Sequence, residues 1–146
     1  MTIVVITMIN RDVVVELMKS GNLAHDQVHG MLQPFGLTLQ QFNVLRILRG
    51  RKGAASCLES ITHHMIQRMS NTSRLVDRLI AKGLAHREIC ADNRRKVEIF
   101  ITKKGLDLLK DIDPILDTTE EEITSSLSNQ EMEHLLQLLT KLKSKN

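Results

Sequence analysis

The sequence predicts a mainly α-helical protein of the α+β class, in which a single β-hairpin interrupts a series of amphipathic helices. Apolar residues recur near helical spacing along most of the 146 residues, which is typical of helices that pack on a core. Alternation of apolar and polar residues is confined to positions 84–102, where it predicts two strands. Glycines, prolines and capping residues separate the segments and set their order.

The first two helices are expected to flank a short break in the chain. Apolar spacing predicts one helix over residues 11–32, and Pro34 and Gly36 then interrupt the pattern. Thr38 can cap a second helix, which ends at Gly50. The apolar residues before position 10 lack the positive charges and cleavage site of a signal peptide, so we expect none.

Two further helices precede the hairpin. A short helix is expected over residues 58–65, followed by a tight connection and a longer helix that begins near Ser70 and ends at Lys82 and Gly83. Its apolar side would face the core, which leaves a polar side for solvent or a ligand. That polar side comprises Asn71, Thr72, Ser73, Arg74, Asp77 and Arg78.

The hairpin and the C-terminal helices complete the pattern. Residues 84–88 and 96–102 are the expected strands, with a charged tip between them. Helical spacing resumes at Lys103, and Ser128 with Glu131 forms a capping box that opens a final amphipathic helix. With no repeat or long linker, the sequence predicts a single domain.

Composition excludes several classes of protein. Hydrophobic residues make up 42% and charged residues 25% of the chain, which argues against disorder, and no apolar run is long enough to span a bilayer. Cys57 and Cys90 are too few for a disulfide-stapled secreted scaffold, so we expect a cytoplasmic protein. The sequence contains no phosphate-binding glycine loop, nucleophile elbow or metal-binding His-Glu motif. We therefore expect neither an enzyme nor a cofactor.

Charge is distributed unevenly along the chain. Residues 68–104 carry a net charge of +6, whereas the preceding segment carries +2 and the following one −5, for a total of +3. A polyanion would therefore meet the middle of the chain and be repelled by the C-terminal part. The middle is the candidate binding face.

The order of helix, short helix, turn, helix and basic hairpin predicts a winged helix-turn-helix that binds duplex DNA. One helix can enter the major groove while the hairpin, or wing, contacts the flanking backbone or minor groove. The candidate contacts on the helix are Ser70, Asn71, Thr72, Ser73, Arg74 and Arg78. On the wing they are Arg94, Arg95 and Lys96, with Asp92 expected to hold the loop and support Arg94.

Other interpretations remain open at this stage. The polar helix side is, taken alone, more often a solvated surface, and a winged helix can also serve as a protein-binding module without DNA. A metal- or thiol-responsive regulator is a further alternative. His25 and His29 have the i, i+4 spacing of two metal ligands, and Cys57 and Cys90 lie where a helix start or basic neighbours can activate a thiol. In each case an ordinary structural role is favoured.

The residues of the third long helix and the wing resemble the multiple-antibiotic-resistance regulator (MarR) family of transcription factors. The resemblance rests on the segment from Leu75 to Leu84, on Arg87, on Asp92-x-Arg94-Arg95 and on Thr102-x-x-Gly105. It departs from the family pattern at Gln67 and Arg68, and at Asn93, where a second aspartate is common.

The resemblance implies a division of labour along the chain. It implies one MarR-type domain over residues 1–146, with a DNA-binding lobe at 38–102 and dimerisation helices at 10–33 and 103–144. It further implies a homodimer that binds a pseudo-palindromic operator and usually represses until a small-molecule effector releases it. No motif marks where the effector binds.

Overall fold

The computed structural model describes the backbone of residues 2–67 and 71–145, and side chains in these ranges from residue 8 onward. The chain divides into two compact units. One comprises residues 28–115, and the other combines residues 1–27 with residues 116–146. We call the first unit the lobe and the second the terminal unit.

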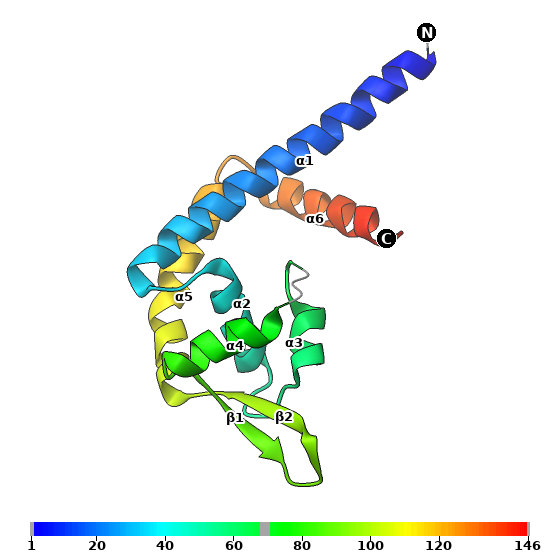
Figure 1. The fold of residues 1–146 in the computed structure, drawn as a ribbon. Helices are drawn as coiled ribbons and strands as arrows, with labels where there is room; N and C mark the ends of the chain where they lie inside the picture. Colours follow the sequence, from blue (N-terminus) through cyan, green and yellow to red (C-terminus); the bar gives the residue numbers. More distant parts are fainter. Residues whose placement is uncertain (1, 68–70, 146) are drawn as a thin grey trace. The chain divides into compact units, whose positions relative to one another are not determined.

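The described elements confirm the mainly helical α+β class. Helices form most of the chain, and the only sheet in the described part is a two-stranded hairpin. Figure 1 shows the elements in chain order: α1 (Thr2–Leu32), η1 (Gln33–Phe35), α2 (Leu39–Gly50), α3 (Leu58–His64), α4 (Thr72–Ala81), β1 (Ala85–Cys90), β2 (Asn93–Ile101), α5 (Lys103–Thr124) and α6 (Asn129–Lys143).

The first helix is longer than the sequence pattern predicts. α1 begins at Thr2 rather than near Arg11, so the expected start was wrong. Its opening residues are largely β-branched, which lowers intrinsic helix propensity and hides a helical period. They include neither glycine nor proline, however, so no residue between Thr2 and Arg11 interrupts the helix.

Both expected helix caps are confirmed. The Thr38 hydroxyl accepts a hydrogen bond from the Gln41 amide at 3.1 Å, and the Gln41 side chain accepts one from the Thr38 amide at 3.2 Å. Ser128 and Glu131 form the same reciprocal box at the start of α6, at 3.2 and 3.1 Å. Each box satisfies amide groups that have no partner inside the helix, which fixes where α2 and α6 begin.

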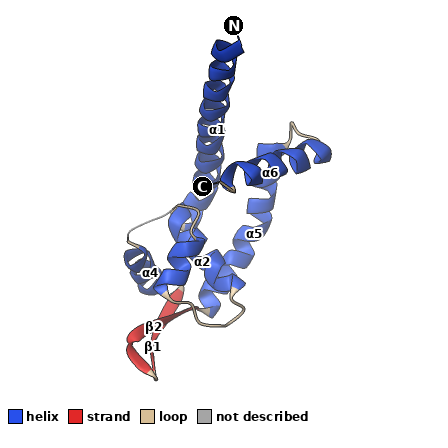
Figure 2. Cartoon of the chain, turned by 90° about the vertical axis from the view of Figure 1, so that its right-hand side faces the viewer, coloured by secondary structure: helices blue, strands red, loops and turns tan. Residues whose placement is uncertain are grey.

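The core of the lobe is formed by α2, α3, α4, the base of the hairpin and the first half of α5. Within the lobe, α2 lies against α4, α3 and β2, and α4 lies against α3 and β1. The hairpin, red in Figure 2, extends away from these helices. The largest side chains with almost no exposed surface here are Leu32, Val44, Leu45, Leu48, Ile61, Leu79, Ile99, Leu109 and Ile112.

An isolated bridge adds a third segment to the base of the hairpin. The Ser56 amide donates to the Ile99 carbonyl at 3.0 Å, and the Ile99 amide donates to the Ser56 carbonyl at 2.8 Å. The connection between α2 and α3 is thereby attached to β2. A single bridge has no periodic signal in the sequence, so the amino-acid pattern does not predict it.

Gly105 allows α5 to begin close to the hairpin. A Cβ at this position would overlap the Leu84 carbonyl oxygen and lie 2.8 Å from the Ile101 side chain. Thr102 completes the junction, because its hydroxyl donates to the Gly83 carbonyl at 2.7 Å and accepts from the Gly105 amide at 3.1 Å. The Thr102-x-x-Gly105 spacing therefore has a structural reason.

The terminal unit exposes many apolar side chains. α6 has no buried residue, and several leucines on it are more than two-fifths exposed. The exposed large apolar residues of the described part of α1 are Met8, Ile9, Val13, Val14, Val15, Met18 and Leu23. None of the helices described is long and apolar enough to cross a membrane.

Candidate nucleic-acid interface

The amphipathic character expected of the third long helix is confirmed in α4. Leu75, Val76 and Leu79 are buried against the lobe. Ser73 and Arg74, with Asp77 and Arg78, are exposed on the opposite side. This outer face places two guanidinium groups and a small hydroxyl on one side of a rigid helix.

Thr72 does not belong to that outer face. Its side chain is only 5% exposed, and its hydroxyl lies 2.7 Å from the Thr62 hydroxyl of α3. Because the Thr62 hydroxyl already donates to the Leu58 carbonyl at 2.8 Å, the Thr72 hydroxyl must donate to Thr62. The expectation that Thr72 is open to solvent was wrong, since contact with Thr62 of α3 buries this side chain.

The start of α4 is formed by backbone groups rather than by a side-chain cap. Asn71 occupies the cap position with φ −127° and ψ 41°, and its side chain makes no capping hydrogen bond. Its carbonyl accepts from the Arg74 amide at 3.0 Å. Asn71 is exposed, so its amide group is open to a ligand. Ser70, the expected cap-side contact, lies outside the described residues.

The end of α4 follows the Lys82-Gly83 signal. Gly83 has φ +73°, its amide donates to the Ile80 carbonyl, and the Leu84 amide donates to the Leu79 carbonyl. This is the double hydrogen bond of a Schellman cap, which favours glycine at the left-handed position. The Lys82 ammonium donates to the Gly36 carbonyl and to the Gln41 side chain, which ties the end of α4 to the start of α2.

An ion pair joins the outer face of α4 to the wing. The Arg87 guanidinium of β1 donates to the Asp77 carboxylate at 2.8 Å, with both side chains about half exposed. Asp77 is thus paired with Arg87 of the same chain, whereas its position on the polar side of the helix predicted a group open to solvent or a ligand. Asp77 and Arg87 both belong to the family motif in the sequence. The motif does not reveal that they pair, because their contact depends on the fold.

The wing contains a bulge in β2. β1 and β2 pair regularly from Ala85 and Ile101 to Ile89 and Val97, and the next pair is Cys90 with Asn93. Arg94, Arg95 and Lys96 therefore have no residue opposite them on β1, and all three side chains are exposed. A bulge of this kind twists a strand and redirects its side chains. Strand β2 begins at Asn93, so Arg94 and Arg95 lie in the strand and not in the loop tip that the sequence predicted, whereas Lys96 lies in the strand as expected.

Asn93, rather than Asp92, holds this bulge. The Asn93 side-chain oxygen accepts a hydrogen bond from the Arg95 amide at 3.1 Å. Within the described part of the chain, Asp92 makes no hydrogen bond or ion pair, so the expected support of Arg94 by Asp92 is not formed here. An Asn oxygen can brace the two following residues as an Asp carboxylate would, without adding negative charge beside the arginines.

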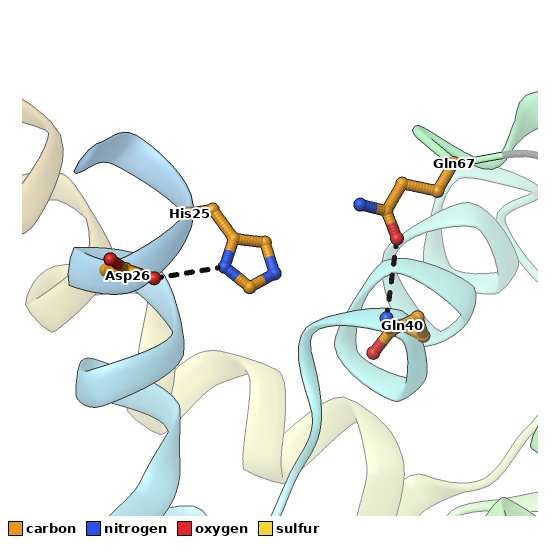
Figure 3. Close-up of polar contacts among 4 residues, drawn as sticks. All are labelled: His25, Asp26, Gln40 and Gln67. Carbon is orange, nitrogen blue, oxygen red and sulfur yellow. Dashed lines mark hydrogen bonds and ion pairs between the residues drawn. The ribbon is translucent and has the colours of Figure 1, made fainter. Parts of the chain in front are cut away.

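The histidine pair with metal-ligand spacing, for which an ordinary structural role was favoured, lies on α1. His25 Nδ1 lies 3.5 Å from an Asp26 carboxylate oxygen, as Figure 3 shows, and His29 is half-buried. Among the residues described, no group of three or more His, Cys, Asp or Glu side chains is placed to hold a metal ion.

Figure 3 also shows the contact of Gln40 Nε2 with Gln67 Oε1 at 3.4 Å, which joins the start of α2 to the segment after α3.

The two cysteines occupy different settings. Both are free thiols. Cys57 is exposed at the start of α3, where its sulfur accepts a hydrogen bond from the Ser60 amide at 3.4 Å. Cys90 is half-buried at the end of β1. Cys57 therefore caps α3 through its sulfur. The sequence predicted only that Cys57 lies near the start of a helix.

The helix pair α3–α4 followed by the hairpin β1–β2 defines a winged helix-turn-helix protein. Solved structures share this fold over nearly the whole chain. BpsR of Bordetella bronchiseptica, whose DNA binding is regulated by 6-hydroxynicotinic acid, superposes with a TM-score of 0.82 at 22% identity, over 91% of this chain and 99% of BpsR.

Two further structures carry the family name. A mutant MarR from E. coli complexed with operator DNA gives a TM-score of 0.79 at 22% identity, covering 87% of this chain and 90% of that one. A MarR transcription factor from Planctomyces limnophilus gives 0.72 at 28% identity, covering 89% and 94%. The family model described as MarR family matches residues 37–97. Residues 37–97 of the lobe thus match the MarR family, and the resemblance seen in the sequence is confirmed.

Proposed function

We propose that this chain is a transcriptional regulator that binds duplex DNA with sequence specificity. The observation that carries the proposal is the continuity of two basic surfaces within the lobe. The Asp77–Arg87 ion pair links the wing to the outer face of α4, which carries Arg74 and Arg78, and the same wing carries Arg94. A helix that enters the major groove beside a hairpin on the flanking backbone is a known arrangement of DNA-binding domains.

The proposed contacts divide into two groups. Ser73 and Arg74, near the start of α4, would contact base edges, with Asn71 beside them and Arg78 on the backbone. The bulged stretch of Arg94, Arg95 and Lys96 would contact phosphates or a narrow minor groove. Thr72 is left out of the contacts because its hydroxyl is buried.

We propose further that the protein acts as a homodimer. α1 and α6 present apolar side chains to solvent in the single chain, among them Val14, Met18, Leu135 and Leu138. An exposed apolar surface of this extent on two helices is typical of a subunit interface. Two copies would place two α4 helices on one pseudo-palindromic operator. In this arrangement one domain spans residues 1–146, with dimer contacts along 10–33 and 103–144.

We propose that the protein acts in the cytoplasm as a repressor, and that binding of a small molecule relieves the repression. The support comes from the fold shared with BpsR, whose DNA binding responds to a small organic acid, and from MarR crystallised on operator DNA. Repression follows from steric exclusion if the operator overlaps a promoter.

The decisive experiment measures affinity for duplexes selected from random sequence, as a function of salt. The logarithm of the affinity should fall with a slope of roughly −0.9 per phosphate contact against the logarithm of salt concentration. Arg94→Ala should weaken binding to all duplexes and reduce the slope by about 1, whereas Arg74→Ala should cost about 1–3 kcal/mol and also relax sequence preference. Lys110→Ala removes the same charge from the exposed surface of α5 and serves as the matched control.

Two outcomes would contradict the proposal. Unchanged affinity in both arginine variants would remove α4 and the wing from the interface. Absence of retention on any duplex at low salt would favour the alternative of a winged-helix module that binds another protein.

A further inference from the structure

The wing carries an exposed apolar side chain beyond the core of the lobe. Ile89, near the outer end of β1, is 69% exposed, whereas the other large apolar side chains of the two strands are buried or half-buried. Figures 1 and 2 both show that the outer half of the hairpin extends past the helices of the lobe. A single exposed isoleucine is common on protein surfaces, so the groups around it decide what it contacts.

Ile89 lies on the face of the wing that is turned toward α4. Side chains two positions apart on a strand share a face, so Ile89 follows Ala85 and Arg87 outward along β1. At the base of this face, Ala85 and Ile99 are buried in the lobe. Further out, Arg87 donates to Asp77 on the outer face of α4. Ile89 is the next residue outward, on the same side as the candidate DNA contacts of α4.

The opposite face of the wing is acidic. Glu88 and Glu98 lie directly across from each other on the two strands. His86 stacks on Phe100 with ring centroids 5.1 Å apart, and its Nε2 lies 3.4 Å from a Glu88 carboxylate oxygen. Two adjacent carboxylates repel a phosphate backbone. DNA is therefore expected to meet the wing on the face of Ile89 rather than on the face of the two glutamates.

The basic bulge lies directly beside this apolar residue. Ile89 and Val97 form the last regular pair of the hairpin, and the bulge that follows carries Arg94, Arg95 and Lys96, all exposed. An apolar side chain next to several cations suits the minor groove, where phosphates line the rim and the base edges lie between them. Proteins that bind this groove combine basic residues with inserted apolar ones.

We propose that Ile89 contacts base edges in the minor groove next to the α4 site and selects against G·C pairs there. The inference rests on the proposed function, because it takes α4 to lie in the adjacent major groove. In the minor groove, G·C differs from A·T by the N2 amino group of guanine. Against the Ile89 side chain this donor loses its hydrogen bond to water and gains no acceptor, which weakens binding. Ile89 is thus a specificity-determining residue, while the arginines of the wing supply attraction to phosphates.

Inosine provides the decisive probe. Footprinting of a selected duplex with the full chain locates the base pairs under the wing, and these are then made A·T, G·C or inosine·C. Inosine·C resembles G·C in the major groove but lacks the N2 amino group. The wild-type chain should bind the A·T and inosine·C duplexes alike and the G·C duplex about tenfold more weakly. Equal affinity for the G·C and inosine·C duplexes would overturn the proposal.

Variants separate direct contact from support of the wing. Ile89→Ala should bring the affinities for the G·C and inosine·C duplexes closer together, and Ile89→Val should keep most of the difference. Ile89→Ala removes no charge, so its salt slope should equal that of wild type. A displaced wing would instead lose the Arg94 contact and reduce the slope by about 1. Such a reduction in Ile89→Ala would make Ile89 a structural residue and overturn the contact.

The matched control is Leu106→Ala, which truncates a 41% exposed apolar side chain on α5 of the same lobe. It should leave discrimination between the duplexes unchanged, and an equal loss there would overturn the assignment to Ile89. Circular dichroism checks that each variant is folded. Analytical ultracentrifugation checks the remaining occupant, a second copy of the chain. Weaker self-association in Ile89→Ala, with discrimination between duplexes unchanged, would place Ile89 at an interface between copies and refute the contact with DNA.

Failure of this inference is distinguishable from failure of the proposed function. A wild-type chain that binds no duplex would refute both. A chain that binds its selected duplex tightly, with the same discrimination in wild type and Ile89→Ala, would leave the proposed function in place and overturn the Ile89 contact alone.

Discussion

The lobe buries many of its apolar side chains, whereas the terminal unit leaves many of its own exposed. Among the described residues, nearly all buried apolar side chains lie within 28–115, and Leu116 at the start of the second part of the terminal unit is the exception. α6 buries none. The leucines of α2 and α4 are covered by the lobe itself, whereas Leu135 and Leu138 remain at least two-fifths exposed.

The contrast separates two sources of stability. Burial within one chain contributes at any protein concentration, while burial between two chains contributes only when they associate. The lobe holds the candidate DNA contacts on a scaffold that is complete in one chain. The terminal unit instead carries exposed apolar residues, which the proposed dimer would bury. Predictions that separate these two contributions therefore test the proposed dimer.

The largest effect is expected from a truncation in the lobe. Leu45 has no exposed surface, so Leu45→Ala should lower the free energy of unfolding by about 2–5 kcal/mol at every protein concentration. Urea unfolding followed by circular dichroism measures this loss. In the same assay at low concentration, Leu138→Ala on the surface of α6 should cost less than about 0.5 kcal/mol. Similar losses in both variants would erase the contrast between the two units.

A charge on α6 should act through association. Leu138 is 51% exposed, and Leu138→Lys should weaken a dimer at least about tenfold, which corresponds to about 1.4 kcal/mol. Analytical ultracentrifugation over a dilution series gives the dissociation constant. Gln137→Lys adds the same charge at the adjacent exposed position and is the control. A monomeric wild-type chain at all concentrations would refute the dimer outright.

The buried hydroxyl pair marks the inner limit of the DNA-binding face. Thr72→Val removes one hydrogen bond to Thr62 and should cost about 1 kcal/mol, with duplex affinity unchanged once the folded fraction is allowed for. Ser73→Ala, one residue along, should change stability by less than about 0.5 kcal/mol and weaken duplex binding. Thermal unfolding and a duplex titration of both variants decide the point. The reverse pattern would return Thr72 to the interface.

The sequence was sufficient for the order of elements because each signal is local. Thr38 and Ser128 bond to residues three positions away, and Gly83 adopts a conformation that its neighbours cannot adopt easily. The basic stretch of the wing was recognised for the same reason, since its charges are adjacent in the chain.

What the sequence did not predict depends on contacts between distant segments. Thr72 is buried because α3 lies against it, and Asp77 is occupied because β1 passes nearby. The bulge is set by a register shift, which an alternating pattern cannot reveal when the shifted residues are all polar. Ser56 makes one bridge, with no repeat to mark it.

The smallest effect is expected from an exposed ion pair on α5. Lys103 donates to Asp107 at 2.8 Å, and this hydrogen bond lowers the pKa of Asp107 below its ordinary value of 3.8. A lowered pKa in the folded state means that any stability gained is present above the ordinary value and is lost as pH falls through the folded value. Both side chains are more than half exposed, so about 1 M salt should largely screen the pair.

Asp107→Asn should therefore leave the melting temperature nearly unchanged at pH 7, and any difference from wild type should disappear in high salt and at acid pH. Arg49→Gln is the informative comparison, because the Arg49–Asp113 pair joins α2 to α5 through two bonds of 2.7 and 3.0 Å and is only about a third exposed. It should lower the melting temperature more than Asp107→Asn does. A larger fall in melting temperature in Asp107→Asn than in Arg49→Gln would mean that the exposed pair stabilises the lobe more than the Arg49–Asp113 pair does.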